Sequence, residues 1–284
     1  MALKLMYITN VPKIAEIAEN AGVDWIFIDM EFIGKDARQG GLDTVQNHHT
    51  AEDIRNVKQS ISTAKVLVRI NPIHEELPYY QSSRDEINEA IAAGADILML
   101  PFFHTVNEVE EFISLVGDRA KTCLLLETPE AAELLEKILE VPGIDMIHIG
   151  LNDMHLALKM NFMFELLANG KVDEWVQKIK SKGIMCGFGG IAGLNTGLLP
   201  GAKVLKEHCR LGSEMVIVSR AFCNTDIVTD LDEVKRIFES GIKELRTLEA
   251  ECADKDADYF VQNHKEVVEG VAKIVEIIKS NKIQ

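Results

Sequence analysis

The sequence has few cysteines, and they are not arranged like those that cross-link small secreted domains or bind zinc. There are five, an odd number, and no two of them are spaced C-x-x-C. A disulfide framework and a zinc knuckle are therefore not expected, and a reducing cytosol fits better. Residues 1–10 lack the basic segment and long apolar run of a signal peptide. We therefore expect a cytoplasmic protein.

Basic residues are also scarce, with 30 Lys and Arg against 45 Asp and Glu, which gives a formal net charge of -15. Proteins bind the phosphate backbone of nucleic acids through an excess of Lys and Arg, so nucleic acid is not an expected partner. No apolar run is long enough to span a membrane. Hydrophobic residues nevertheless make up 47% of the 284 residues, which is enough for one large core.

A glycine-rich phosphate turn is missing after the first apolar run, where an open, doubly wound sheet would usually carry one. Instead, short apolar runs alternate with polar breaks and amphipathic segments along the chain. The eight apolar runs span residues 3–9, 25–29, 65–70, 96–100, 122–127, 146–150, 184–190 and 214–220. Strands that alternate with helices form parallel β-α-β units, and eight such strands close a (β/α)8 TIM barrel. We predict this α/β fold for residues 1–225.

Extra C-terminal helices are expected in residues 226–284. The second of them has a broad apolar stripe made of Val267, Val268, Val271, Ile274, Val275 and Ile278. This helical extension packs either on the barrel of its own chain or on a neighbouring subunit, and the sequence leaves both readings open. We expect a homo-oligomer.

Polar residues follow several predicted strands, at the face where TIM barrels hold their active sites. They are Asp29 and Glu31 after the second strand, Arg69 and Asn71 after the third, Glu127 after the fifth, and Asn152 and Asp153 after the sixth. Glu127 and Asp153 would repel each other in a shared cleft, and a divalent cation such as Mg²⁺ or Mn²⁺ would remove that repulsion. The alternative is that each carboxylate caps a helix. Thr128 already fills the cap beside Glu127, whereas Asp153 could cap the helix that follows it.

Three segments, in order, carry a family resemblance. They are "VLVRINP", "AIAAGADILMLPFFHTVNEVEEF" and "LLLETPEAAELLEKILEVPGIDMIHIGLNDMHLAL". They resemble, respectively, the arginine strand, the Gly-Ala…Leu-Pro segment and the metal-binding segment of the HpcH/HpaI aldolase and citrate lyase family. The resemblance covers most of the chain, from about residue 20 to residue 225. It implies a TIM barrel of the pyruvate/phosphoenolpyruvate type and a metal-dependent, class II aldolase.

The resemblance also implies roles for individual residues. Glu127 and Asp153 would bind the metal, which pyruvate would chelate through its carboxylate and keto oxygens. Arg69 would hold the keto or enolate oxygen, and the backbone N–H groups of Asn152 and Asp153 would receive the pyruvate carboxylate. Further candidates for substrate contacts are Glu31 and Asn71.

The carbanion formed in such a reaction needs an electron sink, which is either a metal or a Schiff-base lysine. None of the predicted strand ends carries a lysine, and Lys65 stands at the start of its strand, on the opposite face of the barrel. Metal assistance is therefore the better account.

The sequence departs from the better-known family members at the acid/base position. Phe32 stands where they have a histidine, and Ala92 stands where they have an aspartate. His48 and His49, which precede a predicted helix, are expected at the rim of the site, where one of them could serve as general acid/base. The alternative is that they are surface-loop histidines. His148 is expected to be a packed strand histidine.

We predict a carbon–carbon lyase that joins or separates a pyruvate enolate and an aldehyde. A 2-keto-3-deoxy sugar acid is the first choice of substrate, because the loop after the second strand contains the polar residues Arg38, Gln39, Gln46 and Asn47. Two alternatives stay open. A citrate-lyase-like acyl-CoA lyase would need a basic patch, and none stands out. A barrel that binds a keto acid without turnover is favoured by the altered acid/base position.

Overall fold

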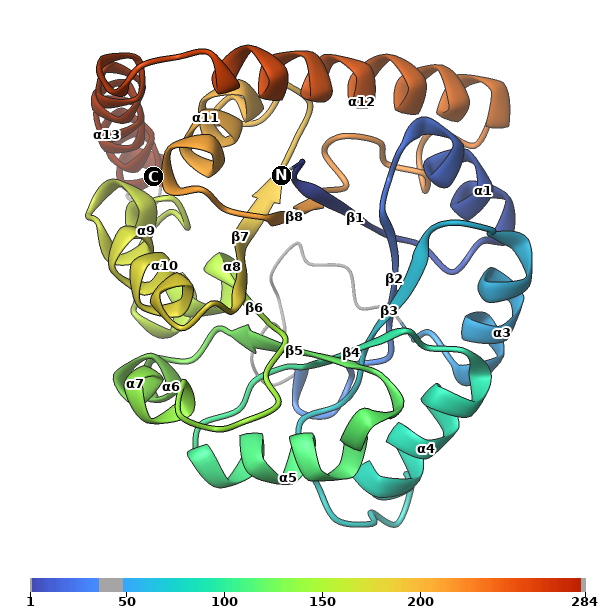
Figure 1. Cartoon of the computed structure of the whole chain (residues 1–284). Coiled ribbons are helices and arrows are strands. Elements are labelled where there is room, and N and C mark those ends of the chain that lie inside the picture. The colour runs from blue at the N-terminus through green and yellow to red at the C-terminus, as the bar shows by residue number, and fades with distance from the viewer. Residues whose placement is uncertain (1, 36–47, 282–284) are drawn as a thin grey trace.

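The computed structural model, in which residues 2–35 and 48–281 are described, shows a closed barrel of eight parallel strands (Figure 1). The strands pair in the order of the sequence, and β8 closes the barrel against β1. They are β1 Lys4–Ile8, β2 Trp25–Asp29, β3 Lys65–Arg69, β4 Ile97–Leu100, β5 Lys121–Leu126, β6 Met146–Ile149, β7 Met185–Ile191 and β8 Met215–Val218. Each falls on one of the eight predicted apolar runs, so the TIM-barrel prediction is confirmed.

Helices follow the strands and cover the outside of the barrel (Figure 1). They are α1 Pro12–Ala21, α3 Ala51–Ser60, α4 Ser83–Ala93, α5 Val106–Val116, α6 Pro129–Glu133, α7 Leu135–Ile138, α8 Leu151–Ala157, α9 Glu165–Ala168, α10 Lys171–Ser181 and α11 Gly201–Leu211. A short 3₁₀ turn, η1 Gly117–Arg119, precedes β5. The helical stretch after β5 is divided into α6 and α7, and the one before β7 into α9 and α10.

Side chains alternate along each strand between the barrel interior and the surrounding helices. The interior is filled by Met6, Trp25, Phe27, Leu67, Ile97, Met99, Cys123, Leu125, Met146 and Met215, and a larger apolar cluster joins the outer strand faces to the helices. Two residues beyond Phe27, Leu67, Leu125 and Met146, the same alternation turns Asp29, Arg69, Glu127 and His148 inward. The barrel therefore has an apolar floor and a polar mouth at the C-terminal ends of its strands.

Local capping sets two helix starts at this mouth. Thr50 and Asp53 form a capping box, in which the Asp53 N–H donates to Thr50 Oγ1 at 3.4 Å and the Thr50 N–H donates to Asp53 Oδ2 at 2.7 Å. Thr128 caps α6 by accepting from the Ala131 N–H at 3.2 Å. The predicted Thr128 cap is confirmed, so Glu127 is not needed as a helix cap.

The C-terminal extension consists of α12 Leu231–Ala253 and α13 Ala257–Asn281. In Figure 1, α12 lies along α1 and α11, and α13 packs on α11 and α9. The buried residues of α13 are Asn263, Val267, Val271 and Val275, and Asn263 Nδ2 donates to Glu207 Oε1 of α11 at 2.8 Å. Val267, Val271 and Val275 of the apolar stripe therefore pack on the same chain, whereas Val268 is 39% exposed. Packing of the extension on a neighbouring subunit stays a prediction. The domain boundary at residue 225 and the homo-oligomer stay predictions.

Arg38, Gln39, Gln46 and Asn47, on which the choice of substrate rested, lie outside the described residues. Across residues 2–35 and 48–281, no helix combines the length and the apolar character needed to cross a membrane. All five cysteines are free. The cytoplasmic location stays a prediction.

Candidate active site

Arg69 and Asp29 form the centre of a charged cluster at the ends of β3 and β2. The two residues are register partners at the last positions of these neighbouring strands. Arg69 donates from Nε to Asp29 Oδ1 and from Nη2 to Asp29 Oδ2, and both distances are 2.8 Å. Glu31 Oε2 lies 3.3 Å from the same Nε. Because a two-point contact of this kind fixes the plane of a guanidinium, the orientation of Arg69 is set before any ligand arrives.

The surroundings of Arg69 keep it charged. Burial alone would lower the pKa of Arg69, but the charges of Asp29, Glu31 and Glu127 raise that pKa well above its usual value. Glu127 acts from the position directly after β5, so the arginine and this carboxylate share one electrostatic site. The Arg69 side chain is 15% exposed, which leaves the cation accessible from the barrel mouth.

Lys35 belongs to the same cluster, although the sequence did not reveal it. Its side chain is 4% exposed, and Nζ lies 3.0 Å from Asp29 Oδ2 and 3.6 Å from Glu31 Oε2. Lys35 reaches the site from the loop after β2 and not from a strand end. The argument that excluded a Schiff-base lysine because none stands at a strand end was therefore wrong. The ion pairs of Lys35 are nevertheless those of an ammonium group, whereas a Schiff base requires the free amine.

Asn71 holds the backbone that follows β2. Its Oδ1 accepts from the N–H groups of Phe32 and Ile33, both at 2.9 Å. Its Nδ2 donates to the Met30 carbonyl at 3.3 Å and to Glu86 Oε1 at 2.8 Å. Asn71 is fully buried, so its hydrogen bonds support the backbone of the site from the protein interior. Its predicted contact with substrate stays a prediction.

Glu127 lies directly beside the turn that follows β6. The carboxylate is buried, and Oε1 accepts from the Phe102 N–H at 3.0 Å. A Cβ atom at Gly150 would lie 2.8 Å from Glu127 Cβ and 2.9 Å from Glu127 Oε2. Glycine at this position therefore allows the turn to pass against the glutamate. This close approach brings the first turn of α8, which carries Asp153, to the side of Glu127.

Asn152 and Asp153 are the second and third residues of α8, and Gly150 occupies the N-cap position. The alternative in which Asp153 caps this helix is therefore wrong. The N–H groups of a first helical turn have no acceptor within the helix, so those of Asn152 and Asp153 are placed to meet an anion. Both side chains are partly exposed at the mouth. Their predicted roles as substrate and metal contacts stay predictions.

His49 is tied to the backbone of Asp29. The ring Nδ1 accepts from the Asp29 backbone N–H at 3.0 Å, and the backbone N–H of His49 donates to the Asp29 carbonyl at 3.3 Å. Because Nδ1 accepts, the neutral ring carries its proton on Nε2. Burial lowers the pKa of His49, and the charge of Asp29 partly offsets that effect. His48 is exposed, with its ring 6.5 Å from that of Phe32. Of the two histidines, His49 is the one in contact with the cluster.

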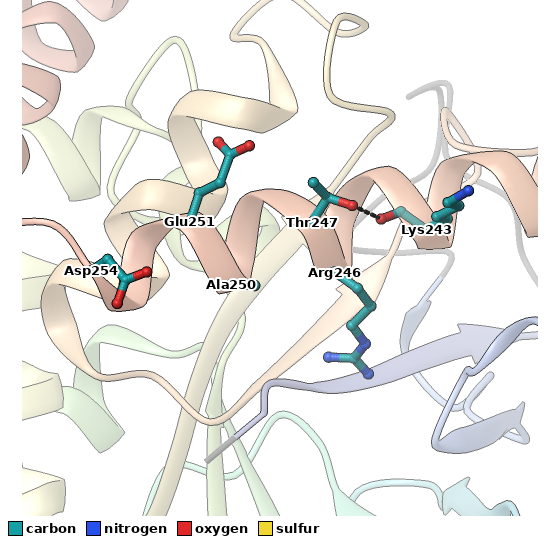
Figure 2. A pocket seen from close by; sticks show the side chains of 6 residues that line it. All are labelled: Lys243, Arg246, Thr247, Ala250, Glu251 and Asp254. Atoms are coloured by element: carbon teal, nitrogen blue, oxygen red, sulfur yellow. Dashed lines mark hydrogen bonds between the residues drawn. The ribbon is translucent and has the colours of Figure 1, made fainter.

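Two hollows lie at opposite ends of the barrel. One, of about 410 Å³, adjoins the loop after β2, and its lining includes Met30, Phe32, His48, His49 and Tyr80. The other, of about 530 Å³, lies on α12 and is lined by Lys243, Arg246, Thr247, Ala250, Glu251 and Asp254 (Figure 2). Arg246 reaches from α12 to the Leu3 carbonyl at 2.7 Å, just before β1 begins. The larger hollow therefore belongs to the N-terminal face, away from the strand ends that carry the charged cluster.

Glu127 and Asp153 are the residues that could hold a metal ion. Within the described part of the chain, there is no cluster of three or more His, Cys, Asp or Glu side chains placed to bind one. Two carboxylates supply hard oxygen donors and leave coordination positions open for water and substrate, a set that suits Mg²⁺ or Mn²⁺. The contact at Gly150, which a Cβ would obstruct, brings the two donor-bearing segments together. The residues present therefore fit a divalent cation.

The sequence profile of the HpcH/HpaI aldolase/citrate lyase family matches residues 4–165, more than half of the chain. The chain belongs to this family. The matched span contains Asp29, Arg69, Glu127 and Asp153, so the charged cluster and the candidate metal ligands both fall inside the HpcH/HpaI region.

Two curated relatives are each named 2-keto-3-deoxy-L-rhamnonate aldolase. The protein of Klebsiella pneumoniae subsp. pneumoniae is 26% identical over 174 residues, which cover 51% of this chain and 57% of that protein. The protein of Shigella dysenteriae serotype 1 is 23% identical over 209 residues, which cover 63% of this chain and 70% of that protein. This member of the HpcH/HpaI family thus matches 57% to 70% of the length of these relatives.

Two solved structures share the fold. The HpcH/HpaI aldolase of Desulfitobacterium hafniense has a TM-score of 0.59 and 16% identity, and the match covers 82% of this chain and 93% of that one. An HpcH/HpaI aldolase/citrate lyase family protein of Burkholderia cenocepacia has a TM-score of 0.60 and 16% identity, with coverage of 82% and 95%. At this identity the likeness supports the barrel architecture alone.

Proposed function

We propose that this member of the HpcH/HpaI family is a class II aldolase that requires a divalent metal. It would form or cleave a carbon–carbon bond between pyruvate and an aldehyde. The observation that carries the proposal is the two-point contact between Arg69 and Asp29, which holds a permanent cation at a mouth that also contains Glu127. This arrangement supports a reaction in which negative charge develops on a keto oxygen.

Glu127 and Asp153 would hold the metal, and the bound cation would supply Lewis-acid polarisation of the keto acid. Arg69 binds the oxygen of the keto group and stabilises the charge that this oxygen gains when the carbon–carbon bond breaks. Its guanidinium is already oriented by Asp29, so little reorganisation is needed during the reaction. The N–H groups of Asn152 and Asp153 at the start of α8 receive the substrate carboxylate.

His49 is the side chain we favour for assisting the proton transfer. Its Nε2 carries the proton when the ring is neutral, because Nδ1 is already engaged by the Asp29 N–H. Because Nδ1 is held by the Asp29 N–H, full transfer of the Nε2 proton would leave an anionic ring. Nε2–H therefore donates a hydrogen bond that polarises the aldehyde oxygen, and a water molecule beside this nitrogen supplies the proton of the new hydroxyl or removes it during cleavage. Replacing His49 tests whether the ring is needed for this transfer.

A 2-keto-3-deoxy sugar acid is the substrate class we propose. Two relatives that each match more than half of this chain are named for the cleavage of such a compound, 2-keto-3-deoxy-L-rhamnonate. The hollow beside His49 adds polar groups to this side of the mouth, among them Arg55, Tyr80 and Gln81. Such groups suit the hydroxyls of a sugar-derived aldehyde better than they suit an apolar one.

The exchange of pyruvate methyl protons with D₂O, followed by proton NMR, tests the proposal. We expect exchange with Mg²⁺ or Mn²⁺, none with EDTA, and losses of about 100-fold or more in Glu127→Gln and in Asp153→Asn. Glu136→Gln, which changes an exposed carboxylate of α7, is the matched control and should exchange at the wild-type rate. Exchange that survives EDTA and both site variants would refute the metal-dependent reaction.

Lys35 requires a separate control. Sodium borohydride added with pyruvate reduces a Schiff base and links the two covalently, which mass spectrometry detects. We expect no adduct, because Lys35 is paired with Asp29 and Glu31. An adduct that disappears in Lys35→Met would transfer the chemistry from the metal to the lysine. Metal and pyruvate binding without exchange would instead favour a barrel that binds a keto acid without turnover.

A further inference from the structure

His148 on β6 has a buried nitrogen atom that the fold does not satisfy. The residue is 1% exposed, and among the described residues its Nδ1 has no hydrogen-bond partner. Its Nε2 lies 2.9 Å from the Gly189 carbonyl oxygen, which can only accept. Nε2 therefore carries the proton, and Nδ1 presents a lone pair. Because an unsatisfied buried acceptor costs folding free energy, the fold alone does not account for His148.

His148 lies directly beneath the proposed site. It points into the barrel, two residues beyond Met146 of the interior cluster, and its register partner on β5 is Leu125. Glu127 and Gly150 each lie two residues further along the same two segments. Burial, together with the positive charge of Arg69, lowers the pKa of His148 to about 4. The ring is thus neutral at neutral pH, and Nδ1 remains an acceptor within electrostatic reach of Arg69.

The guanidinium of Arg69 has an N–H group that can donate toward the acceptor Nδ1 of His148. Within the described residues its hydrogen bonds come from Nε and Nη2, and both go to Asp29. The Nη1 group is the part of the guanidinium that this contact does not use. A buried water molecule needs at least two polar partners, and Nη1 as donor with His148 Nδ1 as acceptor would supply them.

We propose that His148 is a positioning residue of the active site, whose Nδ1 shares one bound water molecule with Nη1 of Arg69 and so aims the guanidinium at the substrate's keto oxygen. The inference rests on the proposed function, in which Arg69 holds that oxygen. Asp29 fixes the Nε and Nη2 edge of the guanidinium, and the water held by His148 fixes the Nη1 group. The histidine is therefore retained at a site where an apolar side chain would pack without leaving an unsatisfied atom.

Exchange of pyruvate protons in variants at His148 tests the inference. In His148→Phe, which removes the acceptor, we expect the maximal exchange rate to fall by about tenfold or more. The half-saturating pyruvate concentration should change little, and the thermal midpoint should not fall. His148→Asn, which keeps an acceptor near the position of Nδ1, should recover most of the rate. Wild-type exchange in His148→Phe would overturn the inference.

His208 offers a matched control. It is also 1% exposed and also has an unpartnered ring nitrogen, Nε2, within the described residues, but it lies outside the barrel on α11, stacked on Phe188. His208→Phe should exchange pyruvate protons at close to the wild-type rate. An equal slowing in both phenylalanine variants would show a general effect of losing a buried histidine and would also overturn the inference.

Nitrogen NMR of ring-labelled histidine separates a failure of this inference from a failure of the proposed function. We expect the Nδ1 resonance of His148 at the position of a hydrogen-bonded acceptor, and we expect Arg69→Lys to move it. A resonance typical of a free acceptor would contradict the shared water, whatever the activity. If the wild-type protein exchanges no pyruvate protons, the proposed function fails, while the resonance still decides whether His148 holds the water.

Discussion

Arg69 and Asp29, at the ends of adjacent strands, are joined by two hydrogen bonds of 2.8 Å, and Lys35 donates to the same carboxylate at 3.0 Å. Asp29 therefore orients the cation that we assign to the keto oxygen, and it does so from a side chain that is 1% exposed. A buried carboxylate between two cations stabilises both of them, and neither cation is well placed without it.

Replacing Asp29 by Asn should affect both folding and turnover. The substitution leaves the geometry of β2 intact but removes the charge that Arg69 and Lys35 share. Removing one partner of a buried ion pair leaves the other charge uncompensated, which costs about 3–5 kcal/mol. The free energy of unfolding should fall by an amount of this order. Urea unfolding measures that loss, and pyruvate proton exchange measures the loss of activity. Full activity in a stably folded Asp29→Asn protein would argue against a role for Asp29 in orienting Arg69.

Gly150→Ala should weaken metal binding more than it weakens the fold. The new Cβ would come within 2.9 Å of Glu127 Oε2, so the carboxylate must move away from the start of α8. We expect the affinity for Mn²⁺, measured by calorimetry, to fall by about tenfold or more. Gly270→Ala on α13 is the control, because its Cβ would meet Leu199 Cδ1 at an ordinary 3.6 Å. Equal Mn²⁺ affinity in both variants would contradict the proposed donor pair.

The two loop histidines should differ in their effect on turnover. His49→Ala removes the ring that contacts the Asp29 backbone, and we expect the aldol rate constant to fall by about 100-fold. His48→Ala, which changes an exposed side chain next to it, should stay close to wild type. The pair is measured by steady-state cleavage of a 2-keto-3-deoxy sugar acid. If His49→Ala keeps full activity, the ring is not needed for the proton transfer.

The position of the site could be read from the sequence, because TIM barrels hold their active sites at the C-terminal ends of the strands. Reading the polar residues at those ends identified Arg69, Glu127 and the turn after β6. Lys35 was missed because the lysine folds back from a loop, where no periodicity links it to Asp29. The hydrogen bond between the Asn71 side chain and Glu86 could not be predicted either. Glu86 lies on α4, and the position of that helix depends on the packing of the whole barrel.

The role of Gly150 could have been found from the sequence. A glycine that ends an apolar strand beside another strand ending in a carboxylate is a signal for close approach of the backbone. The unsatisfied nitrogen of His148 could not, because its identification requires the proton on Nε2 to be assigned from the contact with Gly189. Sequence patterns give the direction of a side chain, whereas its hydrogen-bond partners depend on the packing of distant segments.

Buried histidines should make the fold sensitive to mild acid. Burial lowers the pKa of His148 to about 4 and that of His208 to about 3, whereas an unfolded histidine titrates near about 6.5. Above that value the rings are neutral in both states. As the pH falls below it, the unfolded state gains protons first, so each histidine lowers the stability by about 1.4 kcal/mol per pH unit until its folded pKa is reached.

The urea midpoint should therefore decrease steadily between about pH 6.5 and about pH 4. His208→Phe should show a shallower decrease over the same range, because one of the two titrating groups is gone. A variant with an unchanged slope would show that the pKa of His208 is the same in the folded and the unfolded protein. Unfolding curves followed by circular dichroism at several pH values provide the measurement.

Release of pyruvate from a 2-keto-3-deoxy sugar acid tests the central claim most directly. Lactate dehydrogenase and NADH report the product by absorbance, and a panel of such acids covers the unknown aldehyde half. The account predicts cleavage of at least one acid with Mn²⁺ or Mg²⁺, loss of cleavage with EDTA, and recovery when the metal is restored. Cleavage that persists in EDTA and in both Glu127→Gln and Asp153→Asn would contradict it, as would no cleavage of any acid by the metal-loaded protein.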